Sequence, residues 1–507
     1  MGYHPGLEDD GVYLTAVKAR LNPALYPHDA PFFKLQMQAS AFDDFMACFV
    51  RWTRMPLAWA ELFWQLAALF LILWASKKIL NLLFRENSAR WAGVAMVGAM
   101  FTLPVAGSAL YMADQHLHPR NLVAALILLA VWRILAGNRL QAVPFLLAAF
   151  LFHPLMTVFG LSFCAFLTLA MLEPLPLPLR AIRATSFAFF PLLWVFEPAH
   201  PAWSEAVETR NYFYLYRWTW YEWLGALAPI VLFAMLWSFA NKRGETLLAR
   251  CAAAAFFYGV FQQVLAMLLL SPLAPARLMP LQPMRYLQIE YFLLMMLGGA
   301  ALGRFVLKKS VSRWATFLLA INAAMFTWQR VEFSAVPHLE LPGLRSSNPW
   351  LQAFAWIRSN TPVDAYFALD PHYLEAPGED FHSFRALAER SQLADAVKDT
   401  AVVTQVPELG PIWSSQVAAQ AGWRNFTLTD FERLRTTFGV DWAVVAYPQP
   451  PGLSCPWHNA DLAVCRIPAP SLANEQKNFA VPGRIRKMEE LPLLGAEYRT
   501  CSILLSD

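Results

Sequence analysis

Long apolar runs separated by short polar turns fill the chain from about residue 56 to residue 330. A helix that crosses a membrane needs about 20 mostly apolar residues in succession. The runs at 140–153 and 154–173 are separated only by His153-Pro154, so they form either one kinked helix or two short helices that turn back within the membrane. The expected spans, about ten, cover residues 57–76, 91–112, 121–137, 140–153, 154–173, 184–197, 223–240, 246–271, 286–306 and 312–329.

The pattern changes on both sides of this region. Residues 1–55 are rich in carboxylates and indicate an acidic loop beside the membrane, whereas from about residue 331 short amphipathic elements alternate. Apolar residues at helical spacing, β-branched runs and a threonine cap mark those elements. We expect helices at 348–359 and 429–438, strands at 364–369, 442–446 and 463–467, and a proline- and glycine-rich loop at 449–458.

Basic residues mark alternate turns between the expected spans. Such residues favour the cytoplasmic side of a membrane, and about ten spans place all the basic clusters on one side. The acidic N-terminal loop, the loops at 113–120, 198–222 and 272–285, and everything after Gln329 then face outward. The basic clusters are Lys77, Lys78, Arg85 and Arg90; Arg180 and Arg183; Lys242 and Arg243; and Lys308, Lys309 and Arg313.

These patterns predict a mainly α fold, a polytopic membrane helical bundle with a C-terminal extracytoplasmic α/β domain. The parts are an acidic extracytoplasmic loop at 1–55, a transmembrane helical domain at 56–330 and a soluble extracytoplasmic α/β domain at 331–507. Composition supports this class, because 57% of the 507 residues are hydrophobic and only 15% are charged, against about 25% charged in soluble domains.

Net charge and cysteine content limit which partners and metal sites the sequence can be expected to have. A net charge of +4 is too small to indicate a nucleic-acid partner, and the apolar composition makes membrane lipid the expected surrounding. The six cysteines form no metal-binding spacing. Cys455 and Cys465 lie outside the membrane region and could form a disulfide if that part is exported.

The densest candidate chemistry lies near the N-terminus, in the sequence GLEDDGVY at residues 6–13. Three carboxylates, Glu8, Asp9 and Asp10, precede the aromatic Tyr13. Charges at a membrane edge cost little, so a solvated acidic turn explains the stretch as well as a site does. A loop of carboxylates and aromatics also suits a polar substrate whose other end lies in lipid.

The remaining candidates lie in the other outward segments. His28 and Asp29 form either an acceptor-binding pair or a turn after Pro27. Asp114, His116, His118 and Arg120 could bind a metal or a substrate, or could simply be solvated. Arg120 is the favoured member, because a guanidinium matches phosphate geometry. Arg277 and Arg285 flank a proline-rich turn and either contact a phosphate or interact with lipid headgroups.

These features together resemble the GT-C superfamily of polytopic membrane glycosyltransferases. More narrowly, GLEDDGVY at 6–13 and NPALYPHD at 22–29 are similar to an uncharacterised bacterial subgroup of that type, and WIRSNTP at 356–362 and FRALAERS at 384–391 resemble its exported domain. Enzymes of this superfamily ordinarily place a membrane helix before the acidic loop. The sequence shows no such helix, so we expect either a truncated start or an N-terminus exported without its own helix.

The resemblance implies transfer of a sugar from a polyprenyl-phosphate donor to a glycan, lipid or protein acceptor outside the membrane. Asp10, or Asp9 as second choice, would act as general base or would hold a divalent cation, Mg²⁺ or Mn²⁺. Arg285, Arg120 and Arg277 would contact the donor phosphate, with His28, Asp29 and Tyr13 as further substrate contacts. The expected location is a bacterial inner membrane, with the C-terminal domain in the periplasm.

Two other classes remain open on the sequence. A transporter or flippase of lipid-linked glycans should show intramembrane charges around a midplane cavity and internal repeats, and the sequence has few such charges and no repeat. A non-catalytic membrane scaffold would bind a partner through the exported domain. The scaffold predicts that the acidic cluster tolerates replacement, whereas the enzyme predicts that it does not.

Overall fold

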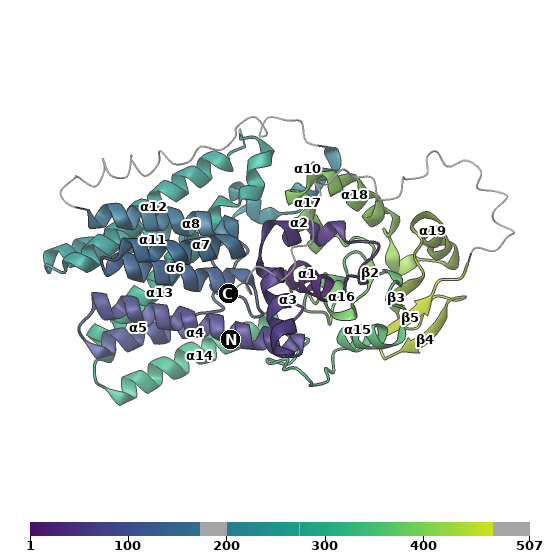
Figure 1. Cartoon of the computed structure of the whole chain (residues 1–507), viewed down its shortest axis with the longest axis horizontal. Helices are drawn as coiled ribbons and strands as arrows, with labels where there is room; N and C mark the ends of the chain where they lie inside the picture. The colour runs from purple at the N-terminus through teal and green to yellow at the C-terminus, as the bar shows by residue number, and fades with distance from the viewer. Residues whose placement is uncertain (173–199, 273, 470–507) are drawn as a thin grey trace, which may run out of the picture.

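The computed structural model describes residues 1–172, 200–272 and 274–469. It is mainly helical, with a helical bundle at one end, a small sheet domain at the other and three N-terminal helices between them (Figure 1). Within these described residues, five helical segments are long and apolar enough to cross a membrane, in keeping with a multi-pass membrane protein. They are Leu57–Leu83, Pro154–Met171, Trp220–Lys242, Thr246–Leu269 and Ala276–Leu307.

The bundle helices follow most of the expected runs, although ten spans are not established and the run at 184–197 lies outside the described residues. The segment Ala276–Leu307 combines 3₁₀ turns, α13 and a π-helical turn. The bundle comprises α4 (Leu57–Leu83), α5 (Asn87–Ala99), α6 (Pro119–Leu135), α7 (Val143–Phe152), α8 (Pro154–Met171), α11 (Trp220–Lys242), α12 (Thr246–Leu269), α13 (Leu287–Leu302) and α14 (Val311–Glu332).

One expected span differs clearly from the structure. Helix α5 ends at Ala99, and residues 100–118 form a non-helical loop in which Pro104 bridges Tyr111. Proline lacks a backbone N–H and disfavours helical geometry in the residue before it. The expectation of a helix over 91–112 was therefore wrong, because the apolar count ignored Pro104.

The pair of short runs resolves into two helices, α7 and α8, that meet at His153. Pro154 is the first residue of α8, and the His153 ring accepts a hydrogen bond from the backbone N–H of Met156 at 3.5 Å. The His153 ring centroid lies 6.1 Å from that of His118, which precedes α6. The turn between α7 and α8 therefore lies at the same end of the bundle as the loop at 100–118.

At the opposite end of the bundle, the guanidinium of Arg304 connects three turns through ion pairs. Arg304 pairs with Glu86 at 3.2 Å and with Glu245 at 2.7 Å, so the turns after α4, α11 and α13 lie together. Lys77, one of the basic residues expected to face the cytoplasm, lies over the Trp91 ring at 4.6 Å, whereas Arg180 and Arg183 lie outside the described residues. Which compartment this end faces stays a prediction.

The N-terminal segment expected as an acidic loop is largely helical. It contains α1 (Asp10–Leu21), α2 (Pro31–Ala39) and α3 (Phe42–Thr53). Helix α1 has Asp10 in its first turn and Lys18 and Arg20 in its last turn, the charge order that the helix dipole favours. These helices lie between the bundle and the sheet domain in Figure 1.

The C-terminal domain has a five-stranded sheet in the order β2-β1-β3-β5-β4. Strands β1, β2 and β3 are parallel, whereas β5 pairs antiparallel with β3 and with β4. Its strands are β1 (Tyr366–Ala368), β2 (Ser391–Gln392), β3 (Trp442–Ala446), β4 (Ser454–His458) and β5 (Leu462–Arg466). Its helices are α15 (Pro349–Asn360), α16 (Phe384–Ala388), α17 (Lys398–Gln405), α18 (Gly410–Ala419) and α19 (Leu428–Phe438), and α10 (Pro201–Glu208) contacts α17 and α18.

The prediction of a loop at 449–458 was wrong for residues 454–458, which form β4 at the edge of the sheet. An edge strand tolerates proline because one row of its backbone groups is unpaired, and Pro456 lies within β4. Cys455 and Cys465 form a disulfide between β4 and β5. The helix expected to open at Thr429 begins earlier, with Thr427 and Asp430 forming a capping box.

Buried ionic contacts attach the N-terminal helices to the sheet domain. The guanidinium of Arg385 binds the carboxylate of Asp29 and both oxygens of Asp399, the latter at 2.6 and 2.9 Å. Lys18 pairs with Glu389 at 2.7 Å. Leu7 forms an antiparallel bridge with His382, so the chain beside the acidic cluster pairs directly with the sheet domain.

Candidate functional site

Asp9 and Asp10 are adjacent in the chain, but their side chains lie in different environments. The Asp10 carboxylate accepts a hydrogen bond from the Gly6 backbone N–H at 2.8 Å, and Asp10 is only 1% exposed. Gly6 makes this tight turn possible with φ of +80°, a conformation that favours glycine. Burial, and then the nearby charges of Glu61 and Asp9, raise the pKa of Asp10 well above its ordinary value. Because the Asp10 carboxylate is buried and already accepts the Gly6 N–H, a substrate hydroxyl cannot reach it. Its inaccessibility therefore argues against Asp10 as the base.

The Asp9 carboxylate, by contrast, is about 33% exposed and lies among cations. Its Oδ2 is 3.1 Å from Arg120 Nη2 and 3.5 Å from His118 Nε2, and its Oδ1 is 3.6 Å from Lys398 Nζ. Burial alone would raise the pKa of Asp9. Lys398, the His118 contact and Arg120 outweigh burial and hold that pKa well below its ordinary value. Asp9 is thus ionised at neutral pH.

Arg120 is held in place at the start of α6. Its Nη2 and Nε donate to the two carboxylate oxygens of Asp114 at 2.9 and 3.2 Å. Gln65 of α4 and Asn121 of α6 both donate to the Asp114 carbonyl oxygen, at 2.7 and 3.1 Å. Although burial would raise the pKa of Asp114, Arg120 and the nearby histidines hold it at about 2. Asp114 therefore orients Arg120, which in turn contacts Asp9.

His118 is fixed in one tautomer by its neighbour. Its Nδ1 accepts the backbone N–H of Arg120 at 2.9 Å, so the neutral ring carries its proton on Nε2, on the side of Asp9. Burial and the charge of Arg120 lower the pKa of His118. The Tyr13 ring meets the His118 ring edge-on, with centroids 4.4 Å apart. Tyr13 and His118 thus form one wall beside Asp9.

His116 is buried two residues earlier. Burial lowers its pKa to about 3, so the ring is neutral. Within the described chain, neither ring nitrogen of His116 has a hydrogen-bond partner. Two neutral imidazoles, at His116 and His118, therefore lie beside the ionised Asp9.

The described residues do not fit a divalent cation held jointly by Asp9 and Asp10. The two carboxylates point apart, and Asp9 already lies among Arg120, His118 and Lys398, whose charges and proton donors disfavour a cation. Among residues 1–172, 200–272 and 274–469, no group of three His, Cys, Asp or Glu side chains is arranged to hold a metal. The metal expected from the sequence stays a prediction that chelation can test.

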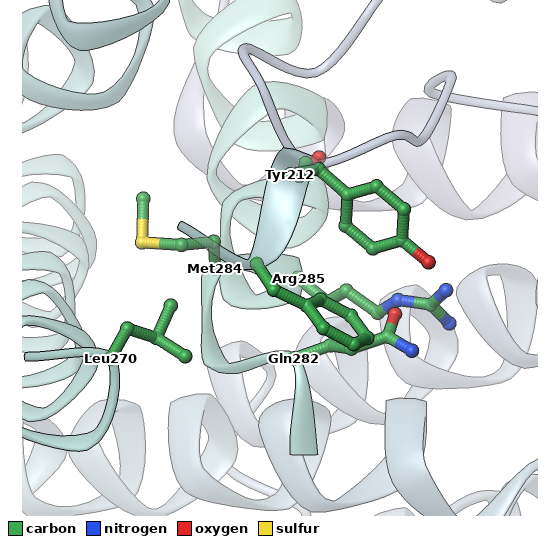
Figure 2. Close-up of a pocket in the computed structure, with 7 residues that line it drawn as sticks. Tyr212, Leu270, Gln282, Met284 and Arg285 are labelled. Atoms are coloured by element: carbon green, nitrogen blue, oxygen red, sulfur yellow. The ribbon is translucent and has the colours of Figure 1, made fainter. Parts of the chain in front are cut away.

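Arg285 and an adjacent pocket extend the site toward the bundle. Arg285 lies in the 3₁₀ turn Pro283–Tyr286, and its charge, with that of Arg120, acts on the Tyr13 hydroxyl. In Figure 2 the polar ends of Arg285, Gln282 and Tyr212 point to one side, whereas Met284 and Leu270 lie on the other. The pocket is shallow and partly open to solvent, with a cavity volume of about 10 Å³, which is room for about one water molecule. Its lining residues are Ser108, Tyr212, Phe213, Leu270, Gln282, Met284 and Arg285.

Of the residues expected from the sequence, the structure brings Asp9, Tyr13, Arg120 and Arg285 together. His28 and Asp29 lie instead against the sheet domain. The His28 ring stacks on Tyr366 with centroids 4.5 Å apart, and Asp29 binds Arg385. His28 and Asp29 thus contact the sheet domain, and their expected contacts with a substrate stay a prediction.

Arg277 lies in the 3₁₀ turn Ala276–Leu281, just before the turn that holds Arg285, and is half-buried. Its expected contact with a donor phosphate stays a prediction.

Sequence reasoning missed Lys398, because it lies almost 400 residues from Asp9 in the chain. The available signal was local. Asp395, Lys398 and Asp399 bring three charges together at the start of a short helix that is otherwise apolar or uncharged. That pattern indicates a charged start of a helix, but it does not reveal that Lys398 lies beside Asp9.

Comparison with family models matches a segment of the sheet domain. A family model described as "Domain of unknown function (DUF6798)" matches residues 348–402. The matched segment contains α15, α16 and the first turns of α17, and therefore Arg385 and Lys398. No curated protein matches the chain.

Proposed function

We propose that this protein is a GT-C-type membrane glycosyltransferase that moves a sugar from a polyprenyl-phosphate donor to an acceptor hydroxyl. The observation that supports this proposal is the partly exposed, ionised carboxylate of Asp9 beside the cation Arg120, at the end of an apolar helical bundle. An ionised carboxylate can accept a hydroxyl proton, and fixed positive charge beside it offsets the charge of a leaving phosphate. The same cations make Asp9 a weaker base than a free carboxylate, so its position and accessibility, and not its pKa, favour it for this role.

In this reaction the acceptor oxygen attacks the anomeric carbon of the donor sugar. The Asp9 carboxylate takes the hydroxyl proton as the new carbon–oxygen bond forms. The bond between the anomeric carbon and the phosphate oxygen breaks, and its electron pair leaves with polyprenyl phosphate. Arg120 and Arg285 offset the negative charge that gathers on that phosphate. Asp9 replaces Asp10 as the proposed base, because the Asp10 carboxylate is buried against Gly6.

In this proposal the shallow pocket beside Arg285 marks the place where the donor phosphate would meet the lipid chain. Its apolar side, with Met284 and Leu270, would contact the first part of the polyprenyl chain, and Arg285 would contact the phosphate. The proposal includes about ten spans in a bacterial inner membrane, with the sheet domain in the periplasm near the acceptor. The acceptor is a glycan, a lipid or a protein.

The test compares Asp9→Asn with Asp10→Asn in purified protein reconstituted in nanodiscs. Release of polyprenyl phosphate from a polyprenyl-phosphate sugar is measured, and thermal unfolding reports folding. We expect D9N to lose about 100-fold or more of the turnover, because a positioned base contributes about 10²–10⁴-fold. D10N is the matched control and should keep most of the turnover, since asparagine can still accept the Gly6 N–H.

Each outcome separates the alternatives. Loss in D10N with retention in D9N would return the role of base to Asp10. Wild-type protein that binds the donor without transfer, and moves it across a bilayer, would favour a flippase. Wild-type protein that binds no lipid-linked sugar would leave the scaffold as the better explanation.

A further inference from the structure

Lys398 reaches from the sheet domain into the site built around Asp9. It is the first residue of α17, and its Nζ pairs with the Glu8 carboxylate and lies 3.6 Å from Asp9 Oδ1. The side chain is 14% exposed. The sheet domain therefore contributes a charged group to a site that is otherwise made by the N-terminal segment and the bundle.

The turn that presents Lys398 is held from several directions. Asp395 Oδ1 accepts the backbone N–H groups of Val397 at 2.8 Å and of Lys398 at 2.5 Å. The Val397 carbonyl accepts a hydrogen bond from Arg210, which lies in the chain before α11. The next residue, Asp399, is bound by both terminal nitrogens of Arg385. The backbone of Lys398 is thus fixed relative to both the bundle and the N-terminal helices.

We propose that Lys398 is a positioning residue that orients the Asp9 carboxylate, so that docking of the sheet domain completes the site. Arg120 holds Oδ2 at 3.1 Å, and Lys398 attracts Oδ1 from the other side. At 3.6 Å the lysine makes no hydrogen bond to Oδ1, and that oxygen keeps a lone pair for a substrate proton. The mechanistic part of this inference rests on the proposed function.

Among the charged groups around Asp9, Lys398 has the largest effect on the charge state of the Asp9 carboxylate. Burial works to raise the pKa of Asp9, and Lys398 is the largest of the influences that lower it. Several further groups face the same region from the elements packed around it. They are Glu8 and Asp10 beside Asp9, Tyr13 on α1, Asp114, His116, His118 and Arg120 at the start of α6, Arg210 before α11 and Arg285 before α13.

The first measurement follows transfer against pH for Lys398→Met, Lys398→Arg and the control Lys18→Met. Lys18 also joins the N-terminal helices to the sheet domain, through Glu389 and the Ala386 carbonyl, without touching Asp9. In K398M we expect the acid limb of the profile to move up by about one pH unit. We also expect kcat to fall about tenfold, with KM within about twofold of wild type. K398R should restore the profile, and K18M should match wild type.

The second measurement needs no substrate and is independent of turnover. A carbodiimide with an amine nucleophile labels protonated carboxyl groups, and fragmentation of the labelled peptide separates Asp9 from Glu8 and Asp10. In K398M the labelling of Asp9 should begin at higher pH than in wild type, whereas K18M should leave it unchanged. If thermal unfolding shows that K398M is not folded, Lys398→Gln is used in place of K398M.

The two measurements distinguish the inference from the proposed function. Labelling that shifts in K398M, in a protein without transfer activity, would overturn the proposed function and keep Lys398 as the residue that orders Asp9. Unchanged labelling in K398M and K398Q would overturn the role of Lys398, even in an active enzyme. A shift of equal size in K18M would mean that loosened docking, and not the charge of Lys398, acts on Asp9.

Discussion

Arg385 and Arg120 each lie between two aspartates, and their surroundings differ. Arg385 lies between Asp29 and Asp399, and all three are nearly inaccessible to solvent. Arg120 lies between Asp9 and Asp114, where Asp9 is about 33% exposed and Lys398 and two neutral histidines lie nearby. We call the first set, with Asp395, the closed cluster, and the second, with Lys398, the open cluster.

The difference shows that the same kind of ion pair has two structural consequences. In one place it attaches the N-terminal helices to the sheet domain, and in the other it leaves one carboxylate accessible to a solute. In the closed cluster all three carboxyl groups, of Asp29, Asp395 and Asp399, are enclosed by protein, and the Arg385 ion pairs hold the N-terminal helices against the sheet domain. In the open cluster one carboxylate remains within reach of a solute while its charge is set by fixed neighbours. Four predictions test this contrast, from the largest expected effect to the smallest.

Breaking the closed cluster should cost the most stability. Arg385→Met leaves Asp29 and Asp399 buried without their cation, and removal of one partner of a buried pair costs about 3–5 kcal/mol. Thermal and denaturant unfolding in detergent micelles would measure the loss. Arg358→Met is the matched control, since Arg358 is 49% exposed and pairs with Glu389 only at 3.8 Å. Equal effects of the two variants would contradict the structural role of the closed cluster.

Substitution beside the open cluster should weaken donor binding and leave folding nearly unchanged. Arg285→Gln keeps a polar side chain beside the pocket but removes the positive charge. A charge-assisted hydrogen bond is worth about 1.5–3 kcal/mol, so we expect the Kd for polyprenyl-phosphate sugar to rise about tenfold or more. Tyr212→Phe, in the same pocket, is the uncharged control. An unchanged Kd in R285Q would remove Arg285 from the phosphate site.

The two clusters should respond to pH with opposite signs. The pKa of Asp114 is lowered to about 2, so its stabilising contribution is complete above its ordinary pKa and is lost as the pH falls through about 2. In the closed cluster, burial and the charge of Asp399 raise the pKa of Asp395 to about 7. Its contribution is complete below its ordinary pKa and is lost as the pH rises through 7.

Thermal unfolding at a series of pH values would test these signs. Asp114→Asn should reduce the loss of stability below pH 4, and Asp395→Asn should reduce the loss that occurs as the pH rises from about 4 to about 7. Asparagine at position 395 can still accept the backbone N–H groups of Val397 and Lys398. A wild-type protein whose stability is flat over both ranges would contradict both assignments.

The smallest expected effect is that of chelation. Because Asp9 lies among cations and Asp10 points away, we expect EDTA to change the transfer rate by less than about twofold. The rate would be measured before and after chelation, and again after addition of Mg²⁺ or Mn²⁺. Loss of transfer that either ion restores would support the metal expected from the sequence.

The sequence was most informative where one local pattern determines the outcome. Runs of apolar residues predicted α4, α11 and α12 closely, and the His153-Pro154 break marked the end of α7. The run at 91–112 misled because Pro104 ends helical geometry inside an apolar stretch. Apolar length alone does not reveal where the backbone stops being helical.

The candidate site was predictable in its residue types and less so in its geometry. Asp9, Tyr13, Arg120 and Arg285 were all expected from the sequence, yet Asp10 was preferred over Asp9. The backbone turn at Gly6, with its positive φ, separates the two carboxylates. No spacing rule reveals that turn, and none connects Lys398 to Asp9 across the length of the chain.

The attachment of the N-terminal helices also bears on how the chain is made. Residues near the N-terminus leave the ribosome first, and domains generally fold in that order during synthesis. Asp29 nevertheless meets Arg385, and Glu8 meets Lys398, only after every described helix of the bundle has been translated. The first helices must therefore wait at the membrane surface for their partners. Premature termination anywhere before Arg385 would leave those carboxylates without their cations.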